Sequence, residues 1–153
     1  MIIYMRRILS YRKALGVDEN ADLKELKTAY RNLIKEWHPD KFQDNPEESQ
    51  AAEEKSKQII KAYHFLVSIA PETIAQTIDG YNETTSNASI EDFEFKSEIL
   101  RIVFSDGNEY EYYGVPKAIY VKLINAETPA RFARRHIYFN YVYRSTSKQV
   151  AVA

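Results

Sequence analysis

The pattern of apolar residues changes near residue 80, and this change constrains the fold more than any other feature of the chain. Before it, apolar residues recur at spacings of three and four, which is typical of amphipathic helices. After it, apolar and polar residues alternate and tyrosines become frequent, which is typical of strands. Residues 80–89 are small, polar and aperiodic, which predicts a loop. The sequence therefore predicts two small domains, residues 1–79 and 89–153, joined by a linker over residues 80–88.

The composition narrows the class of protein. The chain has 153 residues, a formal net charge of −1 and no cysteine. A charge near zero excludes a uniformly basic nucleic-acid-binding protein, and the lack of cysteine excludes disulfides, thiolate metal sites and cysteine nucleophiles. No apolar stretch has the length of a signal peptide core or of a membrane span. We therefore expect a cytoplasmic protein that uses no membrane, metal or cofactor.

Residues 22–37 have the pattern of an amphipathic helix. Asp22 is a good N-cap, and the apolar residues after it recur at helical spacing: Leu23, Leu26, Tyr30, Leu33, Ile34 and Trp37. A second stripe beside them is entirely basic and consists of Lys24, Lys27, Arg31 and Lys35. Taken alone, such a stripe is typical of a solvated helix face.

This helix is predicted to end at His38-Pro39-Asp40, because Pro39 disfavours α geometry in the residue before it and has no N–H to donate. Pro46 then begins a longer helix, whose apolar stripe is Ala52, Ile59, Ile60, Tyr63, Leu66 and Val67. A short turn over residues 11–15 precedes the pair. The sequence thus predicts two antiparallel helices joined by a loop that carries His38-Pro39-Asp40.

Residues 8–68 resemble a J-domain, the module of DnaJ-type cochaperones. The motifs that carry the resemblance follow the family's order: Leu15-Gly16-Val17, Ala29-Tyr30-Arg31, His38-Pro39-Asp40, and Ala62-Tyr63 before Leu66. The resemblance implies an all-α helical hairpin that docks on a DnaK-type chaperone ATPase and stimulates its ATP hydrolysis. Such a domain does no chemistry itself, so we do not expect an enzyme and assign no catalytic residue.

The resemblance also implies which residues contact the chaperone. They are His38, Pro39 and Asp40 in the signalling turn and Lys27, Tyr30, Arg31 and Lys41 on the docking face. Asp40 is expected to engage an arginine of the partner. The basic stripe is expected to meet an acidic patch and to steer the encounter.

The chain departs from the family's pattern at several positions. Asn32 and Glu36 stand where the family often has a basic residue, which predicts weaker or more selective docking. Ser56 lies in the apolar stripe where the family usually has phenylalanine. A buried hydroxyl there loses apolar contact and needs a hydrogen-bond partner; Phe42 is a candidate to fill the space. The family's basic fourth helix is missing, and a short acidic helix is expected over residues 71–79 instead.

The remainder of the chain has the pattern of a small α+β domain with an antiparallel sheet and two helices. Strands are expected over residues 90–95, 100–104 and 109–112, and a last strand over residues 138–144. Two short helices are expected between them, with Pro116 and Pro129 in their first turns.

The segment Ser105-Asp106-Gly107-Asn108 is a hairpin signal. We expect a three-residue loop over residues 106–108 with Asn108 in the left-handed region. This loop would pair Phe104 with Tyr110 and Ile102 with Tyr112.

Residues 86–144 resemble the KTSC domain, named from the C-terminus of some lysyl-tRNA synthetases. The resemblance rests on LRIVFSDGNEYEYYGVPKAIYVKLINAE and RFARRHIYFNY, with Tyr110-Glu111-Tyr112 and Val115-Pro116 at the family's positions. It fails at residues 127–130, where the family often has a small-residue turn with glycine. RNA binding is the function usually suggested for this family.

Three interpretations of this half stay open. Residues 83–111 carry eight acids and two bases, and residues 112–153 carry seven bases and one acid. Phosphate contacts and base stacking would let the half hold unpaired RNA, through Tyr110, Tyr112, Arg131, Arg134, Arg135 and Arg144. Alternatively, the tyrosines form the core and the arginines are solvated or paired with the acidic hairpin, which we favour. The third interpretation is a protein-interaction module with a tyrosine-rich sheet.

The sequence thus predicts a J-domain cochaperone whose C-terminal domain recruits a client protein or an RNA complex. The alternative is an RNA-binding or protein-interaction module in which the J-like half is a structural scaffold. Catalysis is not indicated, because the chain has no metal-ligand spacing and no Gly-rich phosphate loop, and its three histidines are scattered.

Overall fold

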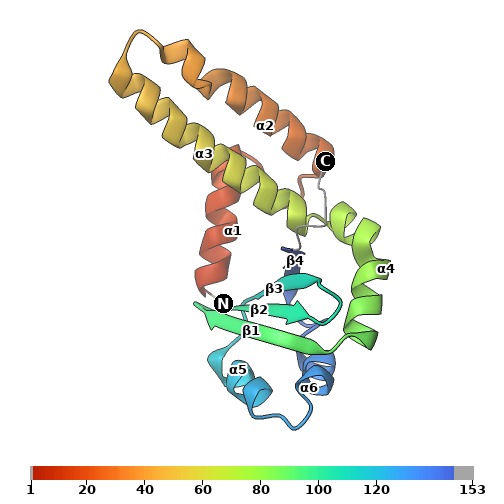
Figure 1. The fold of residues 1–153 in the computed structure, drawn as a ribbon. Helices are drawn as coiled ribbons and strands as arrows, with labels where there is room; N and C mark the ends of the chain where they lie inside the picture. Colours follow the sequence, from red (N-terminus) through yellow and green to blue (C-terminus); the bar gives the residue numbers. More distant parts are fainter. Residues whose placement is uncertain (1, 147–153) are drawn as a thin grey trace. The chain divides into compact units, whose positions relative to one another are not determined.

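The computed structural model describes residues 2–146, which divide into two compact units (Figure 1). Residues 7–73 form the first, which we call the helical unit. Residues 74–146, together with residues 2–6, form the second, which we call the sheet unit. The boundary falls in the first turn of a helix, α4, that spans Pro71–Asn87.

The helical unit is built on two antiparallel helices. α2 (Leu23–Trp37) and α3 (Pro46–Ile69) lie side by side (Figure 1), and α1 (Ile2–Leu15) precedes them. α2 begins where the Asp22 carboxylate accepts a hydrogen bond from the Glu25 amide at 2.8 Å. α3 begins where Asn45 Oδ1 accepts one from the Glu47 amide at 3.0 Å. The predicted helical hairpin is confirmed.

Apolar side chains from all three helices form the core of the helical unit. They are Ile8, Leu15, Leu26, Ala52, Ile59, Ala62, Phe65 and Leu66. The ring of Tyr11 packs against the ring of Phe65, with the centroids 4.8 Å apart. Residues 2–15 form a full helix rather than the short turn expected over residues 11–15, and its second half packs against α3 through Tyr11.

Residues 80–87 are helical, and this corrects the expectation of a linker. α4 continues without a break to Asn87 instead of ending near residue 79. Tyr81, Thr84 and Thr85 are buried, at most 2% exposed. The helical stripe of α4 consists of Ile74, Ile78, Tyr81 and Thr85, at spacings of four, three and four. The small polar residues around it are thus the solvent face of a helix and not a loop.

The sheet unit contains a four-stranded antiparallel sheet in the order β1-β2-β3-β4. The strands are β1 (Ile90–Lys96), β2 (Ile99–Phe104), β3 (Glu109–Tyr113) and β4 (Val142–Ser145). α5 (Lys117–Ile124) and α6 (Pro129–His136) lie between β3 and β4 in the chain. The predicted α+β domain is confirmed. β4 is shorter than expected, because the amide of Tyr138 bonds to the Ala133 carbonyl at 2.9 Å and its side chain enters the core.

One face of the sheet packs against α4, α5 and α6. The sheet contributes Leu100, Ile102, Phe104, Tyr110 and Tyr112, the helices contribute Tyr81, Leu123 and Ala133, and Ile137 follows directly after α6. The Tyr81 ring stacks on that of Tyr143 with the centroids 3.8 Å apart, and its hydroxyl lies 3.0 Å from that of Tyr112. α4 is therefore a structural part of the sheet unit.

The β2–β3 hairpin has a three-residue loop, as expected, but the loop is displaced by one residue. The Phe104 amide donates to the Asn108 carbonyl at 2.8 Å, and the Gly107 amide donates to the Phe104 carbonyl at 3.0 Å. Residues 105–107 therefore form the loop. Gly107, with a φ of 90°, takes the left-handed position that we assigned to Asn108, because a residue without a Cβ adopts it at little cost.

This displacement changes the pairing of β2 with β3. Ile102 lies opposite Tyr110 and Leu100 lies opposite Tyr112, so the expected pairs of Phe104 with Tyr110 and Ile102 with Tyr112 were wrong. The register moves by two residues, and an even shift leaves each side chain on the same face. The predicted core residues are therefore still buried.

Candidate functional site

The turn after α2 holds the residues expected to be functional. α2 ends because His38 has an extended backbone (φ −61°, ψ 130°) and Pro39 begins a single 3₁₀ turn, η1 (Pro39–Phe42). The Asp40 amide donates to His38 Nδ1 at 3.2 Å, and the Lys41 amide donates to the His38 carbonyl at 3.0 Å. His38 thus organises the turn through both its ring and its backbone.

The turn presents the Asp40 carboxylate to solvent. The side chains of His38 and Asp40 are 52% and 76% exposed. His38 Nδ1 lies 3.5 Å from the carboxylate, but a nitrogen that accepts the Asp40 amide has no proton to offer an ion pair. The carboxylate therefore keeps lone pairs that can accept charge-assisted hydrogen bonds from a guanidinium.

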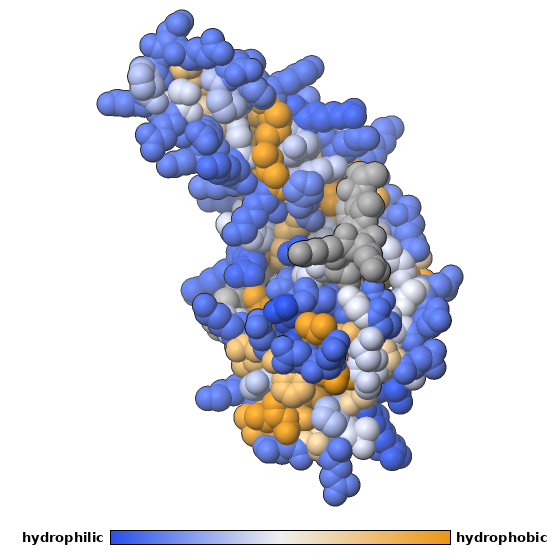
Figure 2. Space-filling view, viewed as in Figure 1, coloured by the Kyte–Doolittle hydropathy of each residue, from blue (hydrophilic) through white to orange (hydrophobic). Residues whose placement is uncertain are grey.

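Basic side chains line one exposed face of α2, which we call the basic face: Lys24, Lys27, Arg31 and Lys35. Within residues 2–146 none of these four forms an ion pair with a carboxylate. Lys41, just after the turn, is also exposed. Figure 2 shows that most of the visible surface of the α2–α3 hairpin is hydrophilic, with a narrow hydrophobic strip along it. The basic face therefore projects uncompensated positive charge beside the turn.

Tyr30, also expected on the docking face, holds the two helices together. It is half-buried, and its ring stacks on that of Tyr63 in α3, with the centroids 4.2 Å apart and 14° between the ring planes. The face of the ring is thus occupied within the unit, so Tyr30 fixes α2 against α3 behind the basic face.

Ser56 has the hydrogen-bond partner that a buried hydroxyl needs. The residue is 9% exposed, and its Oγ donates to the Trp37 carbonyl at 2.9 Å. The Phe42 ring, the candidate to fill the space at Ser56, stacks on the Trp37 ring with the centroids 6.3 Å apart. Lys55 Nζ lies 5.8 Å from the centroid of the same indole. The end of α2 is therefore attached to α3 directly before the turn.

The sheet unit does not bring the proposed RNA-binding residues together. Tyr110 and Tyr112 are 7% and 0% exposed, and burial raises the pKa of both hydroxyls. Their rings pack in the core, so neither can stack on a base. This agrees with the interpretation that the tyrosines form the core, and it corrects their assignment as binding residues.

Two of the four proposed arginines are engaged within the unit. Arg134 Nε and Nη2 donate to the carbonyls of Thr85 and Ser86, each at 3.1 Å, which places a cation at the C-terminal end of α4. Arg144 Nη1 lies 3.8 Å from Glu111 Oε1. Arg131 and Arg135, on α6, are exposed and form no ion pair within the described residues.

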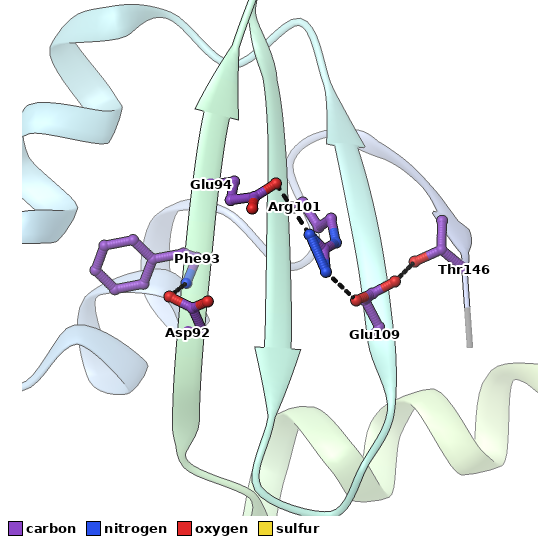
Figure 3. A network of polar contacts seen from close by, with 6 residues as sticks. All are labelled: Asp92, Phe93, Glu94, Arg101, Glu109 and Thr146. Carbon is purple, nitrogen blue, oxygen red and sulfur yellow. Dashed lines mark hydrogen bonds and ion pairs between the residues drawn. The ribbon is translucent and has the colours of Figure 1, made fainter. Parts of the chain in front are cut away.

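The sheet face opposite the three helices carries paired charges (Figure 3). Cross-strand partners alternate in sign along one row: Glu94, Arg101, Glu111 and Arg144. Arg101 lies 2.9 Å from a Glu94 oxygen and 2.7 Å from a Glu109 oxygen. Arg101 thus pairs with carboxylates of its own acidic segment, and Arg144 of the basic segment pairs with Glu111. The arginines of this face are committed to carboxylates.

Comparison with known families agrees with both halves of the chain. The family model of the DnaJ domain matches residues 10–72, and that of the KTSC domain matches residues 84–141. The chain therefore carries a DnaJ domain followed by a KTSC domain, as the sequence motifs predicted.

Curated relatives share the first of these domains. Chaperone protein DnaJ of Thermoplasma acidophilum is 54% identical over 56 residues, which cover 37% of this chain and 14% of the relative. Human DnaJ homolog subfamily B member 6 is 44% identical over 59 residues, or 39% of this chain and 17% of the relative. Chaperone protein DnaJ of Thermotoga petrophila is 34% identical over 102 residues, or 61% and 27%. The match thus spans about a quarter or less of each relative.

No helix in residues 2–146 has the length and apolar character needed to cross a membrane.

Proposed function

We propose that this chain is a non-enzymatic regulator that docks on a DnaK-type chaperone ATPase and stimulates its ATP hydrolysis. The observation that carries the proposal is the exposed Asp40 carboxylate at the end of an unpaired basic face. The two features differ in charge and suit different tasks. The basic face attracts an acidic surface over a distance, and the single carboxylate binds a guanidinium at short range.

The same arrangement supports moderate affinity for the chaperone. Glu36 and Asn32 are exposed on α2, and Glu36 places a negative charge one turn before the His38–Asp40 turn. It offsets part of the field of the basic face. The rate of encounter with an acidic partner is therefore expected to be lower than it would be if residue 36 were basic. This rate should depend more on ionic strength than on apolar contacts, because salt screens the attraction.

The proposal is tested by single-turnover ATP hydrolysis of a DnaK-type chaperone with this protein added. The intact protein should accelerate hydrolysis. Asp40→Asn keeps the shape but removes the charge, and His38→Gln removes the ring that organises the turn, so each should lower the acceleration by at least about tenfold, equivalent to about 1.4 kcal/mol. His64→Gln, an exposed histidine on α3, is the matched control and should behave as the wild type.

Two results would contradict the proposal. One is a wild-type protein, shown to be folded, that leaves the hydrolysis rate unchanged. The other is acceleration that Asp40→Asn and His38→Gln leave at the wild-type level, which would move the contact away from the turn.

For the sheet unit we propose recruitment of a client protein or an RNA complex to the chaperone. The supporting observation is the surface around α6, where Arg131 and Arg135 are exposed and Phe139 is 60% exposed. Exposed cations and an exposed ring are the groups that hold unpaired RNA, through phosphate contacts and stacking. RNA binding with the helical unit as a scaffold is accordingly the second candidate function.

RNA binding is tested by titrating a fluorescent single-stranded RNA at several salt concentrations. If α6 contacts phosphates, changing Arg131 and Arg135 to glutamate should weaken binding at least about tenfold. The slope of log Kd against log salt concentration should also fall by the equivalent of about two phosphate contacts. Reversing Lys117 and Lys122 on α5 is the matched control. Equal binding by both double variants would exclude α6, and no binding by the wild type would leave a client protein as the recruited partner.

A further inference from the structure

The Trp37 carbonyl lies at the end of α2, where the helix can no longer provide a donor for it. The donor four residues later, the Lys41 amide, bonds to the His38 carbonyl instead. The donor three residues later, the Asp40 amide, bonds to His38 Nδ1, and Pro39 has no N–H. Ser56 Oγ, from the facing helix, donates to this carbonyl at 2.9 Å. One serine thus supplies a hydrogen bond that the turn itself cannot make.

The turn lies against α3, but it contributes no side chain to the core. No residue of η1 is buried, and His38, Asp40 and Lys41 are exposed. The residues at its two ends, Trp37 and Phe42, stack their rings on each other and help to hold it against α3. Of the contacts at Trp37, the hydrogen bond from Ser56 is the directional one, and it acts on the backbone atom adjacent to His38.

We infer that Ser56 is a positioning residue for the His38–Asp40 turn: its hydroxyl fixes the end of α2 to α3 and so sets where the Asp40 carboxylate is presented. The consequence for ATP hydrolysis rests on the proposed function. Ser56 does not touch a partner, because it is buried between the helices. Its effect is therefore on the acceleration reached at saturation more than on the encounter, which the basic face controls.

Ser68 provides a matched control for this inference. It lies on the same helix, is also 9% exposed, and donates its hydroxyl to a backbone carbonyl, that of Phe65. That carbonyl belongs to its own helix, and Ser68 lies twelve positions from Ser56, or about 18 Å along α3. Ser68→Ala therefore removes a buried serine hydroxyl without touching the turn.

The functional experiment compares Ser56→Ala, Ser56→Thr and Ser68→Ala in the full chain, measuring single-turnover ATP hydrolysis over a range of concentrations. Ser56→Ala should lower the maximal acceleration by about three- to tenfold, the effect of losing one ordinary hydrogen bond. The half-saturating concentration should change less than about twofold, because the basic face is intact. Ser56→Thr, which keeps the hydroxyl, should restore most of the acceleration, and Ser68→Ala should match the wild type.

The spectroscopic experiment needs no chaperone. Trp37 is the chain's single tryptophan, so intrinsic fluorescence reports directly on the end of α2. Ser56→Ala should shift the emission and speed the amide exchange of Asp40 and Lys41, whereas Ser68→Ala should do neither. These readouts also apply if the wild-type protein does not stimulate the ATPase, so failure of the proposed function is distinguishable from failure of this inference.

The inference is overturned if Ser56→Ala and Ser68→Ala have the same fluorescence and the same exchange at the turn. It is equally overturned if Ser56→Ala lowers the acceleration only in proportion to a loss of folded protein seen in thermal melting, with no change at the turn. Recovery of function by Ser56→Thr without recovery of Trp37 emission would also contradict it.

Discussion

A fragment that begins at residue 89 should remain unfolded, whereas one that begins at residue 70 should fold into the sheet unit. The sequence pattern places a linker over residues 80–88, but α4 runs through that segment. Tyr81 is fully buried, stacks on Tyr143 and forms a hydrogen bond to the Tyr112 hydroxyl. Cutting at residue 89 therefore removes part of the core and not a tether.

The size of the effect follows from the size of the unit. A domain of about 75 residues has a free energy of unfolding of roughly 4–11 kcal/mol, and truncating one buried aromatic side chain costs about 3–5 kcal/mol. The fragment from residue 89 loses Tyr81 together with the buried Thr84 and Thr85, and it leaves the Tyr112 hydroxyl without its partner. The summed loss is comparable to the whole stability.

Amide NMR spectra of the two fragments measure this directly. The fragment from residue 70 should give dispersed peaks, and the fragment from residue 89 should give the narrow range of an unfolded chain. In the full chain, Tyr81→Ala should unfold the sheet unit at much lower denaturant than Asn82→Ala, its exposed neighbour on α4. Dispersed spectra from the fragment starting at residue 89 would contradict this prediction and would support a linker over residues 80–88.

Alkaline pH should unfold the sheet unit through its buried tyrosines. Burial raises the pKa of Tyr81, Tyr112 and Tyr138 above the ordinary value, and it raises that of Tyr143 to about 12. In the unfolded chain these hydroxyls lose their protons near pH 10. Between pH 10 and the folded pKa, the folded state binds more protons than the unfolded state, so its stability falls as pH rises. Below pH 10 these groups contribute no pH dependence.

Each fully buried tyrosine should reduce the free energy of unfolding by about 1.4 kcal/mol per pH unit in that range. Tyr81, Tyr112 and Tyr138 together account for about 4 kcal/mol per pH unit. This loss is large compared with the free energy of unfolding of a domain of this size. In a titration that records both, the part of the tyrosinate absorbance that comes from the buried tyrosines should therefore change together with the circular dichroism, in one steep transition above pH 10.

Tyr138→Phe provides the control for this titration. The Tyr138 hydroxyl has no hydrogen-bond partner within the described residues, so its removal should leave the stability at pH 7 nearly unchanged and flatten the alkaline slope by about one proton. Gradual ionisation of all tyrosines near pH 10 without loss of structure would contradict the prediction, because it would mean that the tyrosines are accessible in the folded state.

The parts of the fold that the sequence predicts are those with a strong local signal. The stripe of α2, the stop at Pro39 and the alternation in β2 and β3 each depend on neighbouring residues, and all three were predicted. α4 was missed beyond residue 79 because half of its buried stripe is threonine and tyrosine, which are β-formers, and because Gly80 weakens the helical pattern. Only packing against the sheet makes this segment a helix.

The candidate site divides in the same way. The His38–Asp40 turn is contiguous in sequence, so its motif locates it. The grouping of Tyr110 and Tyr112 with four arginines depends on which face each strand residue takes and on what covers that face. A charge count cannot supply this, because Glu111 is available to Arg144 only once β3 and β4 have paired. The hairpin register was off by two because the prediction gave Asn108 the backbone position that Gly107 takes.

Because α4 packs against strands that come later in the chain, the two units fold in the order in which they are synthesised. The helical unit is complete once residue 73 has been made, and its contacts are mostly between neighbouring helices, which favours fast folding. The Tyr81 hydroxyl, in contrast, bonds to the Tyr138 carbonyl, 57 positions later in the chain. A newly made chain will therefore present a finished helical unit, with the His38–Asp40 turn in place, before the sheet that makes the rest of α4 helical has been synthesised. With the function proposed above, the nascent protein would engage a chaperone before its own second half has folded.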